Sequence, residues 1–170
     1  MSQETLRYTV LPRVLIFVFR GDELLLMKYS GKGGHMTQEK ADRKNIYNCI
    51  GGHVEQGEDV IEGAIKEAKE EAGIELLDPK VKGIINVSGF AGKNIMNFII
   101  AGTTDDTPLA STEEGSLEWV KRDKVKELNI FPDLIPILGE LFALKDDEMF
   151  VGKAVFDGKF KLESIDFQRV

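Results

Sequence analysis

The sequence is almost free of cysteine: Cys49 is the only one among 170 residues. An intramolecular disulfide is therefore excluded, which fits a reducing compartment such as the cytoplasm. The N-terminal residues 1–10 lack the basic and then apolar pattern of a secretory signal, and no apolar run reaches the length that spans a membrane. We therefore expect a cytoplasmic protein that has no membrane partner.

Positive charge is also in short supply. Lysine and arginine number 22 against 29 aspartates and glutamates, so the net charge is −7. Binding to a nucleic acid polymer requires many phosphates to be neutralised, and we expect no such partner here. A small phosphorylated ligand, held by a few local cations or a metal ion, is compatible with this charge. The length and the 42% hydrophobic content predict a single globular domain over residues 1–170.

Residues 51–74 predict a glycine-bearing loop followed by an amphipathic helix that ends at Gly73. At roughly 100° per residue, Glu67, Glu70 and Glu71 fall on one side of this helix. The other side, which we expect to pack on the core, carries Ile61, Ala64, Ile65, Ala68 and Ala72. Neighbouring like charges on a helix repel by roughly a few tenths of a kcal/mol per pair. The cluster is therefore either solvated or occupied by a cation, and Mg²⁺ favours carboxylates together with substrate phosphates.

The same stretch resembles the sequence box of the Nudix hydrolase family. That box is a glycine, five residues, a glutamate, seven residues, an arginine–glutamate pair, an apolar residue, any residue, two glutamates, any residue, a glycine and an apolar residue. The chain fills it at the correct spacing with Gly52, Glu58, Glu67, Ala68, Glu70, Glu71, Gly73 and Ile74. The one departure is Lys66, which stands where the family has arginine. The alternative interpretation is a charged, solvated surface helix.

The resemblance implies a role for each of these groups. Glu70, Glu71 and the backbone carbonyl of Gly51 would bind Mg²⁺, or Mn²⁺ in its place. Glu67 would bind a second metal ion, or orient or deprotonate the attacking water, and the identity of the general base stays open. Glu114 would complete the ligand set from a distant loop, with its neighbour Glu113 as the alternative.

Glu58 would brace the basic residue at position 66. Arginine offers a planar fork that can hold two carboxylates, whereas lysine is a point charge on a flexible stem. The charge is therefore kept at Lys66 while the geometry is loosened. We expect activity that is lower than that of an arginine version but not abolished.

The resemblance extends to the subfamily that hydrolyses oxidised purine nucleoside triphosphates, such as 8-oxo-dGTP, to the monophosphate and pyrophosphate. It rests on Tyr47-Asn48 before the glycine pair, on Glu113-Glu114 with Trp119, on Phe131-Pro132-Asp133 and on the hairpin over residues 150–167. Phe131 replaces a tryptophan of that subfamily, and Leu134 stands where some members carry a second aspartate.

In this subfamily the asparagine and the aspartate read the edge of the base while the aromatic ring stacks on it. Asn48, Asp133 and Phe131 would take these roles here, and Gly52 would let the backbone approach the ligand closely. The residues also allow plainer interpretations. Asn48 suits a strand end, Phe131 suits the core, and Asp133 suits a helix cap.

The remaining pattern predicts an α/β fold. Apolar strands are expected at 13–19, 23–29, 46–50, 81–88, 95–101, 149–156 and 159–167, with long helices before Gly73 and over 133–144 and a short one over 122–128. A mixed sheet with helices on both faces follows, and the resemblance implies the same α/β/α Nudix fold. The polar loop over 30–44, with Lys32, Lys40, Arg43 and Lys44, is either a flap that meets substrate or a solvated loop.

The leading hypothesis is thus a Mg²⁺-dependent nucleoside triphosphate pyrophosphohydrolase, a monomer or a homodimer, whose partner is a small nucleotide. A second hypothesis keeps the chemistry and changes the substrate to ADP-ribose, a nucleotide sugar or another nucleoside diphosphate derivative. A third is a Nudix-like domain that binds a ligand without catalysis. Such domains usually lose glutamates of the box, whereas this chain keeps them all.

Overall fold

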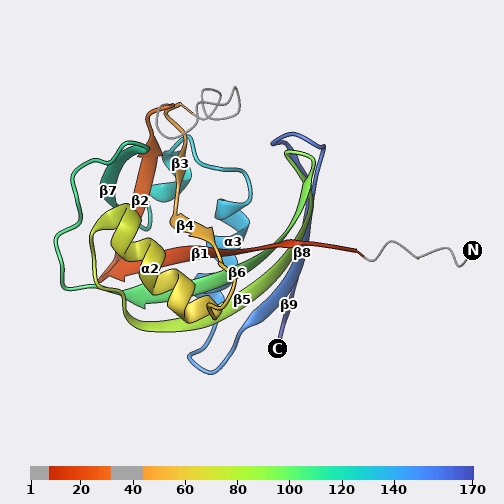
Figure 1. Cartoon of the computed structure of the whole chain (residues 1–170), viewed down its shortest axis with the longest axis horizontal. Helices are drawn as coiled ribbons and strands as arrows, with labels where there is room; N and C mark the ends of the chain where they lie inside the picture. Colours follow the sequence, from red (N-terminus) through yellow and green to blue (C-terminus); the bar gives the residue numbers. More distant parts are fainter. Residues whose placement is uncertain (1–7, 32–43) are drawn as a thin grey trace, which may run out of the picture.

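The computed structural model describes residues 8–31 and 44–170 (Figure 1). Its elements, in chain order, are β1 (Leu11–Arg20), β2 (Glu23–Tyr29), β3 (Tyr47–Asn48), β4 (Ile50–His53), α2 (Val60–Ala72), β5 (Leu77–Phe90), β6 (Lys93–Thr103), β7 (Gly115–Lys121), η1 (Val125–Glu127), α3 (Leu134–Ala143), β8 (Phe150–Phe156) and β9 (Leu162–Arg169). The loop predicted over 30–44 falls, apart from its ends, outside the described residues. None of the described helices is both long and apolar enough to cross a membrane.

The described strands form one mixed sheet. Strand β1 pairs with β6, and β5 with β8, in parallel, while the other pairs are antiparallel. Helix α2 covers one face of this sheet and α3 the other (Figure 1). The predicted α/β Nudix fold, a mixed sheet between helices, is therefore confirmed.

Strands β1 and β2 meet at a turn and then separate. They pair only at Phe19 with Leu24 and at Arg20 with Glu23. Beyond that point β1 pairs with β4, while β2 pairs with β3 and β7. The hairpin predicted from the two apolar runs is thus confirmed only at its turn. The strand predicted over 46–50 is two strands in the structure. Strand β3 pairs with β2, whereas β4 pairs with β1.

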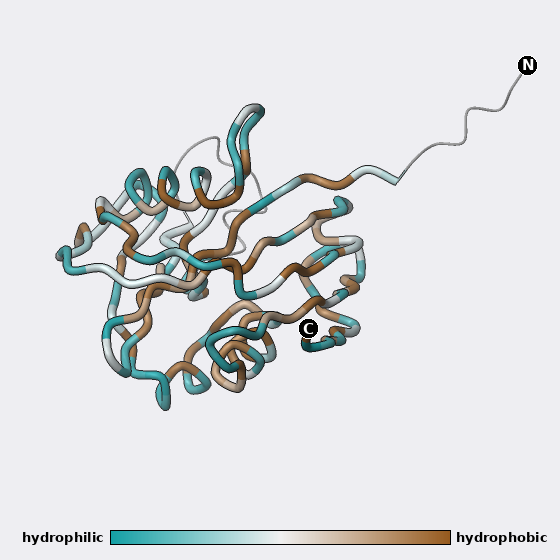
Figure 2. Tube along the Cα trace, turned by 90° about the horizontal axis from the view of Figure 1, so that it is seen from below, coloured by the Kyte–Doolittle hydropathy of each residue, from teal (hydrophilic) through white to brown (hydrophobic). Residues whose placement is uncertain are grey.

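The core lies on both faces of the sheet. Val14, Ile16 and Val18 of β1 pack on the side of α2, whereas Leu15 and Phe17 pack on the side of α3. This double burial explains why the strand is a continuous apolar run without a polar face. Figure 2 shows the same distribution, with hydrophobic segments gathered in the interior strands and hydrophilic ones in turns and at the rim.

Helix α2 approaches the sheet through small side chains. Ala64, Ala68 and Ala72 are fully buried and recur every four residues, so they form one stripe along the helix. Ile65, which we expected on the same side, is 42% exposed, so this prediction is wrong. Because the alanines bring the helix and the strands close together, the contact stripe is narrow and leaves Ile65 outside it.

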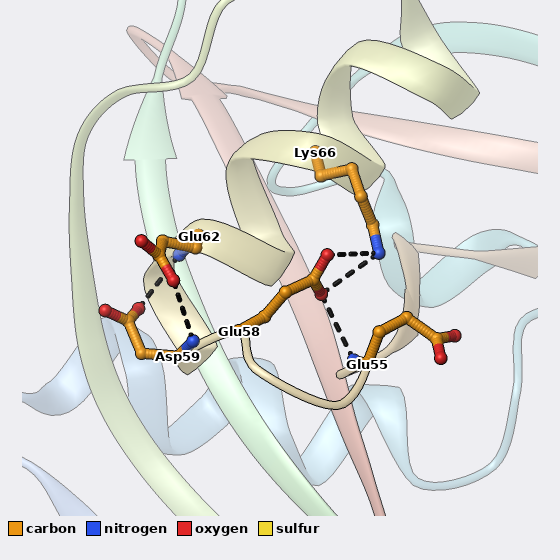
Figure 3. Close-up of polar contacts among 5 residues, drawn as sticks. All are labelled: Glu55, Glu58, Asp59, Glu62 and Lys66. Atoms are coloured by element: carbon orange, nitrogen blue, oxygen red, sulfur yellow. Dashed lines mark hydrogen bonds and ion pairs between the residues drawn. The ribbon is translucent and has the colours of Figure 1, made fainter.

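Both ends of α2 are fixed by local sequence. Asp59 accepts hydrogen bonds from the backbone N–H groups of Ile61 and Glu62, and the Glu62 carboxylate accepts one from Asp59 N at 3.0 Å (Figure 3). Gly73 follows the last turn with φ of 67°, a left-handed conformation that glycine adopts without strain. The helix therefore ends where the sequence predicted, and Asp59 determines where it begins.

Candidate active site

A cleft of about 350 Å³ opens beside β4 and α2. Its volume falls within the range of roughly 300–1,000 Å³ that is usual for small-molecule sites. It is lined by Leu11, Arg13, Tyr29, Gly31, Gly51, Gly52, His53, Glu55, Glu67, Glu71, Phe90, Ala91, Lys93, Ile95 and Glu114. Five of the residues that the sequence predicts for metal or substrate binding are among them: Gly51, Gly52, Glu67, Glu71 and Glu114.

The glycine pair of β4 is required by two close approaches. A Cβ at Gly52 would collide with the carboxyl group of Glu67, and a Cβ at Gly51 would collide with the carbonyl oxygen of Val14 on β1. The sequence predicted glycines that let the backbone approach a ligand. In the structure, Gly52 leaves room for the Glu67 carboxylate that faces the cleft, and its approach to a ligand stays a prediction.

Glu71 connects α2 to β4. The backbone N–H of Gly51 donates a hydrogen bond of 2.8 Å to its Oε2. Burial and, to a smaller extent, the negative charges of Glu114 and Glu67 raise the pKa of Glu71 to about 7, against the opposing effects of the Gly51 N–H and of Arg13. The carboxylates at this cleft therefore repel one another in a partly dehydrated place, and a divalent cation would remove that repulsion.

Glu67 titrates in the same direction. Burial raises its pKa, and the charge of the neighbouring Glu70 adds to the effect. Glu70 itself is exposed and does not line the cleft, so its role as a metal ligand stays a prediction. Of the two acidic candidates before β7, Glu114 lines the cleft and Glu113 is exposed.

The donor chemistry fits a hard cation, although the side chains are not gathered around one point. Within residues 8–31 and 44–170, no group of three or more His, Cys, Asp or Glu side chains converges closely enough to hold a metal ion. Glu67, Glu71 and Glu114 nevertheless face one cleft, and the charges of Glu114 and Glu67 raise the pKa of Glu71. Rotation of these side chains would be needed to complete a coordination shell.

Lys66 forms an ion pair with Glu58 (Figure 3). Its Nζ lies 2.7 Å from Oε1 and 3.0 Å from Oε2, and the same carboxylate accepts the backbone N–H of Glu55 at 3.1 Å. The hydrogen bond from Lys66 lowers the pKa of Glu58, and the bond to Glu58 raises the pKa of Lys66, so both stay charged at neutral pH. The contact fastens the loop before α2 to the helix, as the resemblance implied for an arginine.

A smaller pocket of about 40 Å³ adjoins the cleft. Asn48, Phe131 and Asp133, the three residues predicted to read the base, all line it. Four lining residues are common to both cavities: Arg13, Tyr29, Phe90 and Ile95. The acidic cleft and the predicted base-reading group are therefore adjacent, with these four residues between them.

The alternatives left open for these three residues are resolved in part. Asp133 occupies the cap position of α3, but its side chain makes no capping hydrogen bond, and burial raises its pKa to about 6. Phe131 is only 4% exposed and its ring lies 6.2 Å from that of Phe90, so it belongs to the core and to the pocket wall together. Asn48 Oδ1 accepts the backbone N–H of Cys49 at 2.9 Å.

Sequence reasoning missed Arg13, Lys93, Phe90 and Asn97. The structure places Arg13 in both cavities, Lys93 in the cleft and Asn97 in the small pocket. The available signal was Arg13 itself, since it is a cation directly before the apolar, buried residues 14–18 of its strand.

Comparison with solved structures finds proteins of similar fold. A crystal structure of a mutator MutT protein from Bacillus halodurans superposes with a TM-score of 0.75 at 26% identity, covering 94% of this chain and 98% of the other. A NUDIX hydrolase from Nitrosomonas europaea, at 20% identity and a TM-score of 0.62, covers 79% and 90% and shows the fold alone.

Sequence comparison gives the family. A model of the NUDIX domain matches residues 9–141, and the chain belongs to this family. It is 27% identical over 127 residues to an uncharacterized Nudix hydrolase, YvcI of Bacillus subtilis, across 72% of this chain and 79% of the relative. The protein is thus a Nudix hydrolase, an enzyme that acts on phosphorus-containing acid anhydrides. Such enzymes generally use divalent metals such as Mg²⁺ and act on small nucleotide substrates.

Proposed function

We propose that the protein is a Mg²⁺-dependent pyrophosphohydrolase that cleaves a purine nucleoside triphosphate to the monophosphate and pyrophosphate, with 8-oxo-dGTP or another oxidised purine deoxynucleotide as the favoured substrate. One observation carries the proposal. The cleft lined by Glu67, Glu71 and Glu114 shares four lining residues with the pocket lined by Asn48 and Asp133. Phosphate chemistry and base recognition therefore have places in one site.

The first half of the site suits the anhydride. Its anionic oxygens repel an incoming nucleophile, and bound Mg²⁺ would supply charge neutralisation and a more acidic water. Glu71, the carbonyl of Gly51 and Glu114 would hold that ion, with Glu70 turning in from the surface. Glu67, whose raised pKa brings it closer to neutrality, would orient the attacking water or take its proton.

The second half suits a purine. The Asn48 amide offers both donors and an acceptor, and the Asp133 carboxyl, with its pKa near 6, exists in both protonation states around neutral pH. The small pocket cannot enclose a purine, so we place the ring at the junction of the two cavities with its edge toward these groups. Phe90 and Phe131 would contact its faces.

A nucleotide panel with Mg²⁺ in ¹⁸O-labelled water tests this function. The panel holds 8-oxo-dGTP, dGTP, ATP, ADP-ribose and a nucleotide sugar, and mass spectrometry locates the label in the monophosphate or in pyrophosphate. We expect the largest kcat/KM for 8-oxo-dGTP and loss of turnover in Glu70→Gln. A clear preference for ADP-ribose or the nucleotide sugar over every triphosphate would reject the proposed substrate. Absence of metal-dependent turnover on the whole panel would reject catalysis.

A further inference from the structure

Arg13 lies at the centre of a row of polar side chains across the sheet. In the register of β1 it is the Cα partner of His53 on β4 and of Asn97 on β6. Directly paired residues of neighbouring strands point to the same face. The row begins in the acidic cleft, which His53 lines, and ends in the small pocket, which Asn97 lines, while Arg13 lines both.

The Nε of Arg13 is buried without a hydrogen-bond partner. None of the ion pairs among residues 8–31 and 44–170 includes the Arg13 side chain. A buried N–H group without a partner carries a penalty of roughly 1–3 kcal/mol, and such groups in native proteins call for a specific explanation. Because Arg13 lines both cavities, a ligand that spans them would lie against its side chain.

The nearby carboxylates do not form ion pairs with Arg13. Glu67, Glu71 and Asp133 all experience the positive charge of Arg13, yet none of them forms an ion pair with it among the described side chains. Arg13 therefore lies between Glu67 and Glu71 on one side and Asp133 on the other, and it forms an ion pair with none of them. A cation in that position is available to an anionic ligand that enters the same space.

The chemistry of a nucleotide indicates which oxygen would lie there. The phosphate bonded to the sugar connects the base to the remaining phosphates, as Arg13 connects the small pocket to the acidic cleft. On the basis of the proposed function, we propose that Arg13 binds the phosphate nearest the nucleoside and positions the phosphate chain for attack. The planar guanidinium fork matches two oxygens of such a phosphate.

The test compares ligands that differ only in this phosphate. Calorimetry without metal measures binding of 8-oxo-dGMP against 8-oxo-deoxyguanosine, and of AMP against adenosine, to the wild type, Arg13→Met and Arg13→Lys. Arg169→Met, which removes an exposed arginine on β9, serves as the matched control. Thermal melting followed by circular dichroism reports whether each variant folds. If Arg13→Met does not fold, Arg13→Lys is compared with the wild type instead.

We expect Arg13→Met to weaken binding of the better monophosphate at least about tenfold while nucleoside binding changes less than about twofold. Arg13→Lys should lie between, and Arg169→Met should match the wild type. An equal loss for monophosphate and nucleoside, or no loss for either, would overturn the proposal. The nucleotide panel tests the proposed function separately. A wild-type protein that hydrolyses no triphosphate of that panel would reject the function, whereas the calorimetry tests the role of Arg13 alone.

Discussion

The backbone N–H of Gly51 donates a hydrogen bond of 2.8 Å to Oε2 of Glu71. This bond joins β4 to α2 at the wall of the acidic cleft. It also orients one oxygen of Glu71 toward β4, where we expect the Gly51 carbonyl to bind the same metal ion as Glu71. Burial disfavours the charged form of the Glu71 carboxylate. We therefore expect pH and metal ions to change the stability of the protein through Glu71.

Stability of the metal-free protein should fall as pH rises. Burial raises the folded-state pKa of Glu71 to about 7, above the ordinary value of 4.5. The folded state therefore binds the extra proton between these values, and that stabilisation is full below pH 4.5 and lost as pH rises through about 7. Urea unfolding from pH 4.5 to 8 should show a steeper loss for the wild type than for Glu71→Gln, whose amide keeps the acceptor for Gly51. Parallel curves would contradict the assignment.

Two glycines near the site should respond in different ways to alanine. A Cβ at Gly63 would meet its nearest neighbour, Oε2 of Glu58, at 3.6 Å, which is ordinary contact, so Gly63→Ala should stabilise the helix by about 0.5–1 kcal/mol. Gly52→Ala should lower kcat with little change in stability, because its Cβ would displace the Glu67 carboxylate, which is the end of a flexible side chain. Denaturant unfolding and steady-state kinetics measure both. Loss of stability in Gly63→Ala, or a fully active Gly52→Ala, would be evidence against this packing.

The adjacent acids before β7 form a natural matched pair. Glu114 lines the cleft and Glu113 is exposed. We expect Glu114→Gln to reduce kcat/KM by about a hundredfold, equivalent to roughly 2.7 kcal/mol in the barrier, and Glu113→Gln to change it less than about twofold. The measurement is Mg²⁺ titration of the rate, and the result that reverses the assignment is a larger defect in Glu113→Gln.

Replacement of Lys66 by arginine should raise kcat. Lys66 Nζ contacts both oxygens of Glu58 at 2.7 and 3.0 Å, yet an ammonium on a flexible stem lacks the planar fork that would hold a second carboxylate in fixed geometry. We expect a gain of about threefold to tenfold, or roughly 1 kcal/mol in the barrier, with KM little changed. Lys66→Met should lose activity. If Lys66→Arg is no faster than the wild type, the bracing role is doubtful.

Discrimination between oxidised and normal purines should depend on the ionisation of Asp133. Burial raises the folded-state pKa of its carboxyl to about 6 from an ordinary 3.8, so its protonation state changes between about pH 5 and 7. The ratio of kcat/KM for 8-oxo-dGTP and dGTP should vary over that window in the wild type and be flat in Asp133→Asn. A ratio that varies equally in both proteins would remove Asp133 from base recognition.

The sequence predicted α2 well because its determinants are local. The cap at Asp59, the glycine at position 73 and the spacing of the glutamates all lie within one helix and its flanks. Proximity of Asn48, Phe131 and Asp133 was also predicted, from a resemblance, and the structure places all three in one pocket.

Features that depend on distant pairing could not be predicted in this way. Arg13 acquires its place from its alignment with Asn97, and that alignment follows from the parallel pairing of β1 with β6, which local patterns do not specify. The separation of β1 from β2 likewise depends on tertiary structure, because the two apolar runs could have paired with each other along their whole length. Exposure of Ile65 depends on how closely the alanines of α2 approach the strands.

The central claim is that the acidic cleft captures a divalent cation beside a phosphoanhydride. Anomalous diffraction from crystals soaked in Mn²⁺ tests it most directly. The account predicts a peak bound by the Glu71 carboxylate and the Gly51 carbonyl, with Glu70 turned toward it. Density that shows no ion near Gly51, with Glu70 and Glu71 directed away from each other, would contradict it.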